Sequence, residues 1–162
     1  MHIEQEYDRW LEKAVADPEL GEELRRMDDA KKEDAFYRDL AFGTGGLRGV
    51  IGAGTNRINV YTVAKATQGL ADYLKNHFSN PSVAIGYDSR IKSDLFARVA
   101  AGVFAANGVQ VHIWPTLMPV PTVSFAVRLR FMGIILSVIK CPYLNRIFEL
   151  FQTARCFLKR NL

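Results

Sequence analysis

The sequence predicts an α/β fold, a three-layer α/β/α domain with a mostly parallel sheet that follows a helical N-terminal arm. Two short apolar runs, residues 83–87 and 109–114, have the character of buried strands. Helical patterns precede and follow each run, and this alternation is typical of parallel sheets covered by helices on both faces. Residues 1–40 show helical spacing and contain no such apolar run.

The arm, residues 1–40, is expected to contain three helices. Asp17-Pro18-Glu19 marks a break after the first helix, and Asp28-Asp29 is expected to cap the third. The apolar residues of the first helix fall on one face at helical spacing and are predicted to be buried together. They are Trp10, Leu11, Ala14 and Val15.

The α/β domain is assigned to residues 41–128, and its elements follow a glycine-rich loop in the order helix, strand, helix, strand, helix. Asn59 is expected to cap the first of these helices, over residues 60–78. The buried stripe of that helix is predicted from spacing to contain Val63, Ala66, Leu70, Tyr73 and Leu74. The following elements are a strand at 83–87, a helix from 93 to about 106, a strand at 109–114 and a helix at 120–127. Ligands in such folds bind at the carboxyl ends of the strands, here residues 87–90 and 114–116.

Composition excludes several classes of protein. The chain has 162 residues, 49% hydrophobic and 23% charged, which fits one folded domain with a short appendage. It contains no uninterrupted apolar stretch of about 18 residues, and its acidic, polar beginning lacks the apolar segment of a secretion signal. We therefore expect a cytoplasmic protein. Cys141 and Cys156 form no CxxC motif or disulfide framework, and no metal site is predicted.

Positive charge is concentrated in the tail, residues 129–162, and the arginine just before it. The chain carries a net charge of +4, but residues 1–127 hold 14 Lys and Arg against 16 Asp and Glu. Residues 128–162 hold seven basic residues against Glu149 alone. A basic tail is compatible with a nucleic-acid or membrane partner. We interpret it instead as sequence of foreign composition, and we expect no nucleic-acid partner.

The glycine-rich loop has the composition of a phosphate-binding segment. Six of the 13 residues from 42 to 54 are glycine, and residues 43–49 read Gly-Thr-Gly-Gly-Leu-Arg-Gly. Glycines let backbone N–H groups approach an anion, Thr44 adds a hydroxyl, and Arg48 offers a planar fork suited to phosphate. The loop fits neither the dinucleotide-binding fingerprint nor the P-loop pattern. A tight turn without a ligand is the alternative interpretation.

Residues 42–49, Phe-Gly-Thr-Gly-Gly-Leu-Arg-Gly, resemble the N-terminal signature of the α-D-phosphohexomutases, the phosphoglucomutase and phosphomannomutase superfamily. The resemblance continues in order through the helix at 59–74, Gly-Tyr-Asp-Ser-Arg at 86–90, the helix and strand at 101–111, and the proline-marked turn at 119–127. It covers roughly 90 residues, and the arm together with the Gly-Thr-Gly-Gly variant is most similar to the phosphoglucomutase-like branch.

This resemblance implies an intramolecular phosphotransferase of carbohydrate metabolism that interconverts hexose 1- and 6-phosphates. In that family a phosphoserine of the first domain donates its phosphoryl group, and glucose 1,6-bisphosphate serves as activator and intermediate. Magnesium is held by aspartates of a second domain. By position, Arg48 would face the phosphoserine, Thr44 and Gly45 would shape the loop, and Asp88 and Arg90 would support the same wall or form a structural ion pair.

The family's Thr-Ala-Ser-His-Asn-Pro type of nucleophile loop is not recognisable in this sequence. Ser137 lies near the corresponding position, but Val138 and Ile139 follow it in place of His-Asn, so no catalytic residue is assigned. The tail contains no Asp and a single glycine, Gly133. We interpret it as a reading-frame slip or truncation that begins near Leu129, which leaves domain I incomplete and catalysis uncertain.

Three functions remain open on the sequence alone. The chain is a mutase fragment that is inactive by itself, a noncatalytic domain that binds phosphosugar or associates with a full-length mutase, or a pseudogene product. The tail has two structural alternatives as well: basic amphipathic helices at a membrane surface, or apolar cover for an incomplete sheet. Membrane docking is the least favoured, because nothing else in the chain indicates a lipid partner.

Overall fold

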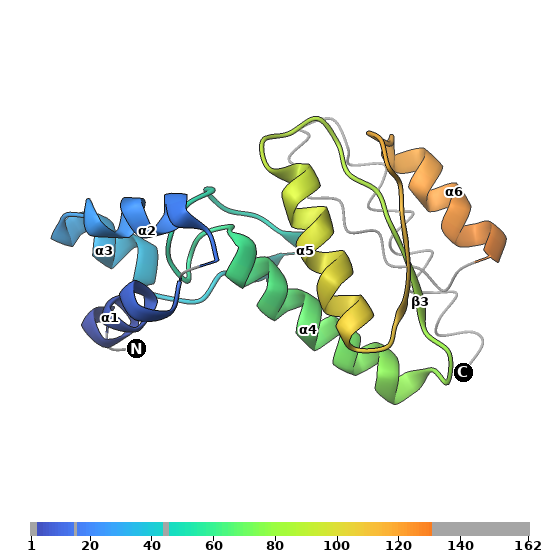
Figure 1. Cartoon of the computed structure of the whole chain (residues 1–162), viewed down its shortest axis with the longest axis horizontal. Coiled ribbons are helices and arrows are strands. Elements are labelled where there is room, and N and C mark those ends of the chain that lie inside the picture. Colours follow the sequence, from blue (N-terminus) through green and yellow to red (C-terminus); the bar gives the residue numbers. More distant parts are fainter. Residues whose placement is uncertain (1–2, 15, 44–45, 131–162) are drawn as a thin grey trace.

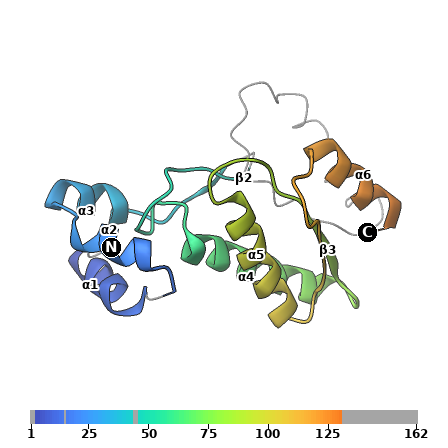
Figure 2. The same cartoon turned by 45° about the horizontal axis from the view of Figure 1, so that its top comes forward.

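The computed structural model describes residues 3–14, 16–43 and 46–130. These ranges contain the following helices and strands: α1 (Ile3–Lys13), α2 (Pro18–Arg25), α3 (Asp29–Phe36), β1 (Phe42–Gly43), β2 (Gly46–Leu47), α4 (Val60–His77), β3 (Ser82–Ile85), α5 (Ser93–Ala106), β4 (Gln110–Ile113) and α6 (Val120–Arg130). The arm lies at one end of the molecule, next to the beginning of α4, in both views (Figures 1 and 2). The predicted α/β class with a helical arm is confirmed.

The arm folds around its own small core. Asp28 caps α3 as predicted, because its side chain accepts a hydrogen bond from the Lys31 N–H. Asp17, where only a break was predicted, caps α2 by accepting a hydrogen bond from the Glu19 N–H. The Phe36 ring meets the rings of Tyr7 and Trp10 edge to face, and all three side chains are buried.

The buried stripe of α1 differs from the prediction. It consists of Tyr7 and Trp10 and continues just after the helix with Ala14, whereas Leu11 is 39% exposed. The prediction for Leu11 was wrong because the stripe begins a turn earlier, at Tyr7, which rotates the buried face away from Leu11. Val15, placed on the same face, lies outside the described residues.

Three layers make up the α/β part. Strands β3 and β4 pair in parallel, from Ser82 opposite Gln110 to Ile85 opposite Ile113. Helices α4 and α5 lie side by side on one face of this pair, and α6 lies on the other (Figures 1 and 2). The core between the layers contains Val83, Ile85, Phe96 and Phe104, each fully or almost fully buried. Within the described ranges the parallel sheet consists of these two strands.

Helix α4 follows the predicted boundaries within one residue, but its buried face is rotated. The buried residues are Val63, Thr67, Ala71 and Leu74, whereas Tyr73, which was expected to be buried, is 48% exposed. The stripe runs through Thr67 because its hydroxyl donates to the Val63 carbonyl oxygen at 2.7 Å, which satisfies the polar group inside the core.

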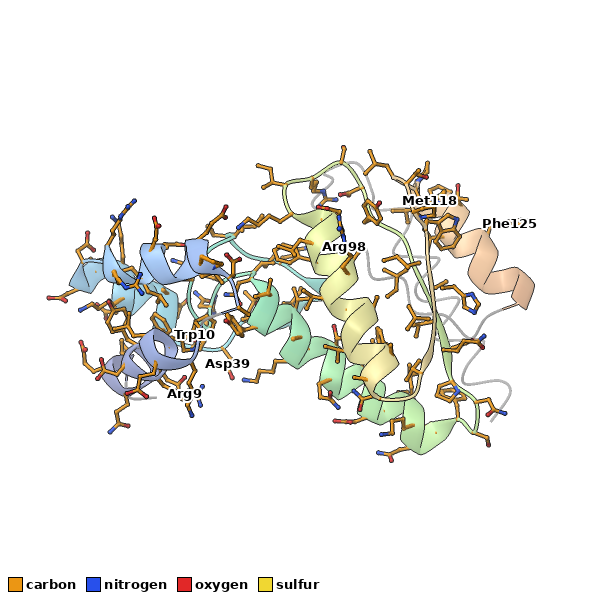
Figure 3. The ribbon with its side chains drawn as sticks, in the orientation of Figure 1. Arg9, Trp10, Asp39, Arg98, Met118 and Phe125 are labelled. Carbon is orange, nitrogen blue, oxygen red and sulfur yellow. The ribbon has the colours of Figure 1, made fainter. Side chains whose placement is uncertain are left out.

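Strand β3 ends at Ile85, two residues before the predicted end, because the chain there turns beneath α6. A Cβ atom on Gly86 would lie 2.3 Å from Cγ2 of Val123 in α6, so this close approach requires glycine. The Tyr87 carbonyl oxygen then accepts a hydrogen bond from the Met118 N–H at 2.9 Å. These contacts bring the chain that follows β3 against the beginning of α6 (Figure 3).

Candidate functional site

The glycine loop forms a short antiparallel hairpin. Phe42 lies opposite Leu47, and Gly43 lies opposite Gly46. Gly46 has a φ of 95°, a region of backbone space that favours glycine. Thr44 and Gly45, two of the predicted phosphate-binding residues, lie outside the described residues.

Arg48 directly follows the hairpin and is exposed. Within the part of the chain that the structure describes, its guanidinium makes no side-chain hydrogen bond or ion pair. A guanidinium beside a glycine-rich hairpin can donate two hydrogen bonds from its planar fork to oxygens of a phosphate group. The predicted placement of Arg48 on an accessible loop therefore fits the anion-binding hypothesis.

Backbone hydrogen bonds fix the chain that follows Arg48. The Ile58 N–H donates to the Val50 carbonyl oxygen at 2.8 Å, and the Gly52 N–H donates to the Ile58 carbonyl oxygen at 3.2 Å. The Leu40 N–H donates to the Thr55 carbonyl oxygen at 2.9 Å, which ties the beginning of the loop to its end. The chain on both sides of the hairpin is therefore held in place by backbone hydrogen bonds.

Asn59 connects this segment to α4 and is only 2% exposed. Its side-chain oxygen accepts hydrogen bonds from the N–H groups of Tyr61 and Thr62, which caps the helix as predicted. Its side-chain nitrogen donates to the carbonyl oxygens of Gly52 and Gly54 at 2.9 and 3.0 Å. The sequence indicated the cap but gave no signal for these two further bonds.

Asp88 and Arg90 follow the carboxyl end of β3, as predicted, and form an ion pair with a distance of 3.0 Å between guanidinium nitrogen and carboxylate oxygen. The second oxygen of Asp88 accepts the Arg90 N–H at 3.2 Å, and the Asp88 N–H donates to the Ser93 hydroxyl at 3.3 Å. Both side chains are less than one third exposed. The structural ion pair, one of the two roles that the sequence left open, is therefore present.

Among the described residues, no hydrogen bond or ion pair joins Arg48 directly to Asp88 or Arg90. Among these described residues the charge on Arg90 is balanced by Asp88, whereas Arg48 has no charged partner there.

Lys92 is a residue that sequence reasoning missed. It adopts a φ of 61°, and its ammonium donates to the Glu19 carboxylate at 2.6 Å and lies 3.8 Å from that of Asp17. The hydrogen bond to Glu19 raises the pKa of Lys92, and the same bond lowers the pKa of Glu19. No helical or strand periodicity signals a contact between residues 73 positions apart.

Two open grooves flank the arm, and neither is lined by Arg48, Asp88 or Arg90. One of about 500 Å³ lies between α2, α3 and Val50, and another of about 270 Å³ lies between α1 and α4. The described ranges contain no cluster of three or more His, Cys, Asp or Glu side chains that could hold a metal ion. None of their helices has the length and hydropathy needed to cross a membrane. Ser137 and the rest of residues 131–162 lie outside the described residues.

Comparison with known proteins gives a family match. The family profile described as "Phosphoglucomutase/phosphomannomutase, alpha/beta/alpha domain I" matches residues 39–141, and so ends 13 residues after Arg128. A phosphoglucomutase of Staphylococcus haemolyticus (strain JCSC1435) is 40% identical over 97 residues, 60% of this chain and 18% of that protein. A phosphoglucomutase of Staphylococcus aureus (strain bovine RF122 / ET3-1) is 37% identical over 119 residues, 74% of this chain and 21% of that protein.

The chain spans about a fifth of the length of these curated relatives. No solved structure matches it significantly. The matched profile covers the glycine hairpin, Arg48 and the Asp88–Arg90 pair, and its α/β/α description agrees with the three observed layers. The chain therefore belongs to the phosphoglucomutase/phosphomannomutase family and carries that family's domain I.

Proposed function

We propose that this chain supplies the phosphate-binding wall of a phosphohexomutase and binds the phosphate group of a hexose phosphate through Arg48. The observation that carries the proposal is the exposed Arg48 guanidinium, which has no hydrogen bond or ion pair among the described residues and follows a glycine hairpin with a fixed base. A phosphate group can accept two hydrogen bonds at once from the N–H groups of such a planar guanidinium. Thr44 and Gly45 are proposed to complete the cradle from the turn of the hairpin.

Asp88 and Arg90 are proposed to support the same wall without binding phosphate themselves. The paired Arg90 and Asp88 together carry almost no net charge, so Arg90 attracts an anion less strongly than Arg48 does. Interconversion of hexose 1- and 6-phosphates is proposed for the whole mutase to which this domain corresponds.

We propose that this chain does not catalyse that reaction alone. Its sequence contains no Ser-His-Asn-Pro loop, and the residues after Ser137 are Val138 and Ile139. Magnesium is the metal that the family implies, but the described residues offer no ligand set for it, so we derive no step through a metal. Glucose 1,6-bisphosphate as activator and a cytoplasmic location belong to the same proposal.

The tail is proposed to be out of frame. The junction then lies between Arg128 and the end of the family match at residue 141. The other reading frames of the DNA downstream of the Arg128 codon are expected to encode a Ser-His-Asn-Pro loop and later mutase domains. Frames without either would overturn the frameshift.

Phosphate binding is tested by titrating the full chain with glucose 1-phosphate and, separately, with inorganic phosphate in a calorimeter. Loss of a charge-assisted bidentate contact is worth about 1.5–3 kcal/mol, so Arg48→Ala should weaken binding roughly 10- to 100-fold. Arg9→Ala is the matched control, because Arg9 lies on the outer side of the arm and pairs with Glu6 (Figure 3). Equal affinity of wild type and Arg48→Ala, or no binding by wild type, would refute the proposal.

Association with a full-length mutase is a second proposal, favoured by exposed apolar side chains near α6. Leu117 is 56% exposed and Phe125 is 61% exposed. Phe125 is labelled on α6 in Figure 3. Contiguous apolar patches at a surface often mark an interface. Co-sedimentation with a purified phosphoglucomutase should be lost in Phe125→Asp. Failure of the wild-type chain to co-sediment would reject the association.

A further inference from the structure

Helix α2 of the arm contacts both segments of the candidate site. Near its C-terminal end, the Glu23 carboxylate accepts a hydrogen bond from the Ala53 N–H at 3.0 Å. At its N-terminal end, Glu19 accepts a hydrogen bond from the Lys92 ammonium at 2.6 Å, and the capping residue Asp17 lies 3.8 Å from the same ammonium. Eight residues of helix thus connect the glycine loop to the chain that follows Arg90.

On the side of the glycine loop, the contact is made to buried backbone. Ala53 is fully buried, and its N–H donates a hydrogen bond to the carboxylate of Glu23 in the arm. The neighbouring Gly52 is hydrogen-bonded to Ile58, which is in turn hydrogen-bonded to Val50. Arg48 precedes Val50 by two residues, so a short path of hydrogen bonds and peptide bonds leads from Ala53 to the backbone of Arg48.

On the side of the strand end, the contact is made to a strained residue. Lys92 is the non-glycine residue with a positive φ among the described ranges, and a lysine in that region of backbone space costs about 1 kcal/mol. Such a conformation persists where the surroundings hold it in place. Here Glu19 and Asp17 hold the ammonium, and the Ser93 N–H donates to the Arg90 carbonyl oxygen at 3.1 Å.

These contacts matter for geometry more than for stability. An ion pair at a surface contributes little to the free energy of folding, and the Glu19 side chain is 77% exposed. The Lys92 side chain makes no capping hydrogen bond to α5 and is directed to the arm instead. Together the two contacts fix the glycine loop and the turn after Arg90 against one helix, α2.

We propose that α2 is a brace that holds Arg48 and the Asp88–Arg90 pair in position relative to each other, with Glu23 and Lys92 as positioning residues for phosphate binding. This inference rests on the proposed function of Arg48. The arm then acts on the site without touching the phosphate: Glu23 acts through Ala53, and Lys92 acts through the turn that follows Arg90.

The test measures amide hydrogen exchange and glucose 1-phosphate affinity on the full chain. The variants are Glu23→Ala, Glu23→Gln, which keeps an acceptor oxygen, and Lys92→Asn, which tolerates the left-handed conformation but loses the charge. Glu22→Ala is the control, because Glu22 is on the same helix and pairs with the exposed Arg26.

We expect Glu23→Ala to raise exchange about five-fold at Ala53 and across residues 46–50, as loss of one hydrogen bond would do, and to weaken phosphate binding three- to five-fold. Glu23→Gln should restore most of both. Lys92→Asn should raise exchange at residues 86–91 and weaken binding to a similar extent, and Glu22→Ala should match wild type.

Several results would overturn the brace. Faster exchange confined to Ala53, with residues 46–50 unchanged, would show that the path to Arg48 does not transmit the shift. If exchange in β3 rises by the same factor as at residues 46–50, the substitution destabilises the whole fold and does not act on the position of Arg48. If wild type binds no phosphate, the proposed function fails, while the exchange at residues 46–50 and 86–91 still decides whether α2 holds the two loops.

Discussion

Substitution of Asn59 is expected to separate the contribution of the loop from that of helix α4. Asn59→Ala removes the acceptor for the N–H groups of Tyr61 and Thr62 and the donor to the carbonyl oxygens of Gly52 and Gly54. All four partners lie at or near a side chain that is 2% exposed, so water does not readily replace the lost bonds.

The size of the effect follows from these contacts. Loss of a helix cap costs about 1 kcal/mol. Each of the two carbonyl groups that loses its donor adds about 1 kcal/mol. The total of about 3 kcal/mol corresponds to a decrease in Tm of roughly 6–12 °C for a chain of this size. Asn59→Asp keeps the cap but places a carboxylate oxygen against both carbonyl oxygens, so it should be at least as destabilising as Asn59→Ala.

Thermal unfolding of the full chain, followed by circular dichroism, measures this decrease. Asn76→Ala is the matched control, since Asn76 is exposed on the same helix and its loss should change stability by less than about 0.5 kcal/mol. An Asn59→Asp variant as stable as wild type would refute the reasoning, because it would show that the bonds to Gly52 and Gly54 contribute nothing.

Two further predictions concern the other segment of the site. Gly86→Ala places a Cβ atom 2.3 Å from Val123 and should cost about 1–3 kcal/mol in a denaturant titration, and adding Val123→Ala should recover part of the loss; simple additivity would contradict the contact. The Glu19–Lys92 pair should make a small contribution to stability between pH 4.5 and 10.5. The lowered pKa of Glu19 makes its contribution vanish as pH falls below 4.5, and the raised pKa of Lys92 does the same as pH rises above 10.5. The Tm difference between wild type and Lys92→Asn should therefore shrink at both extremes, and a difference that is constant with pH would contradict the pair.

Local sequence signals were sufficient for most of the fold. The caps at Asp28 and Asn59 each depend on contacts within a few residues, and both were predicted for that reason. The buried face of a helix depends instead on what packs against it. Tyr73 is apolar enough for the core, but the neighbours of α4 select Thr67, whose hydroxyl finds its own partner in the preceding turn.

The residues of the candidate site also fall into two groups: those that local sequence signals indicate, and those that depend on tertiary contacts. The composition of the glycine loop indicates Arg48, and the spacing of Asp88 and Arg90 allows the ion pair that the structure contains. Glu23 and Lys92 gave no signal, because charged residues on a short helix and before a helix are ordinary surface positions in a sequence. Their contacts depend on where the arm lies against the α/β part, which no local pattern specifies.

The position of the arm also changes how its charged faces are interpreted. From sequence alone, the acidic residues of α2 look like a solvated surface, and Glu22 and Arg26 behave in that way. One helical turn separates Glu19 from Glu23, so the two carboxylates lie on one side of α2 and reach two different loops. A helix with this spacing can hold two loops at a fixed separation only if both carboxylates are present. The arm is therefore joined to the glycine loop by a direct hydrogen bond, although the family profile begins at residue 39, after α3 has ended.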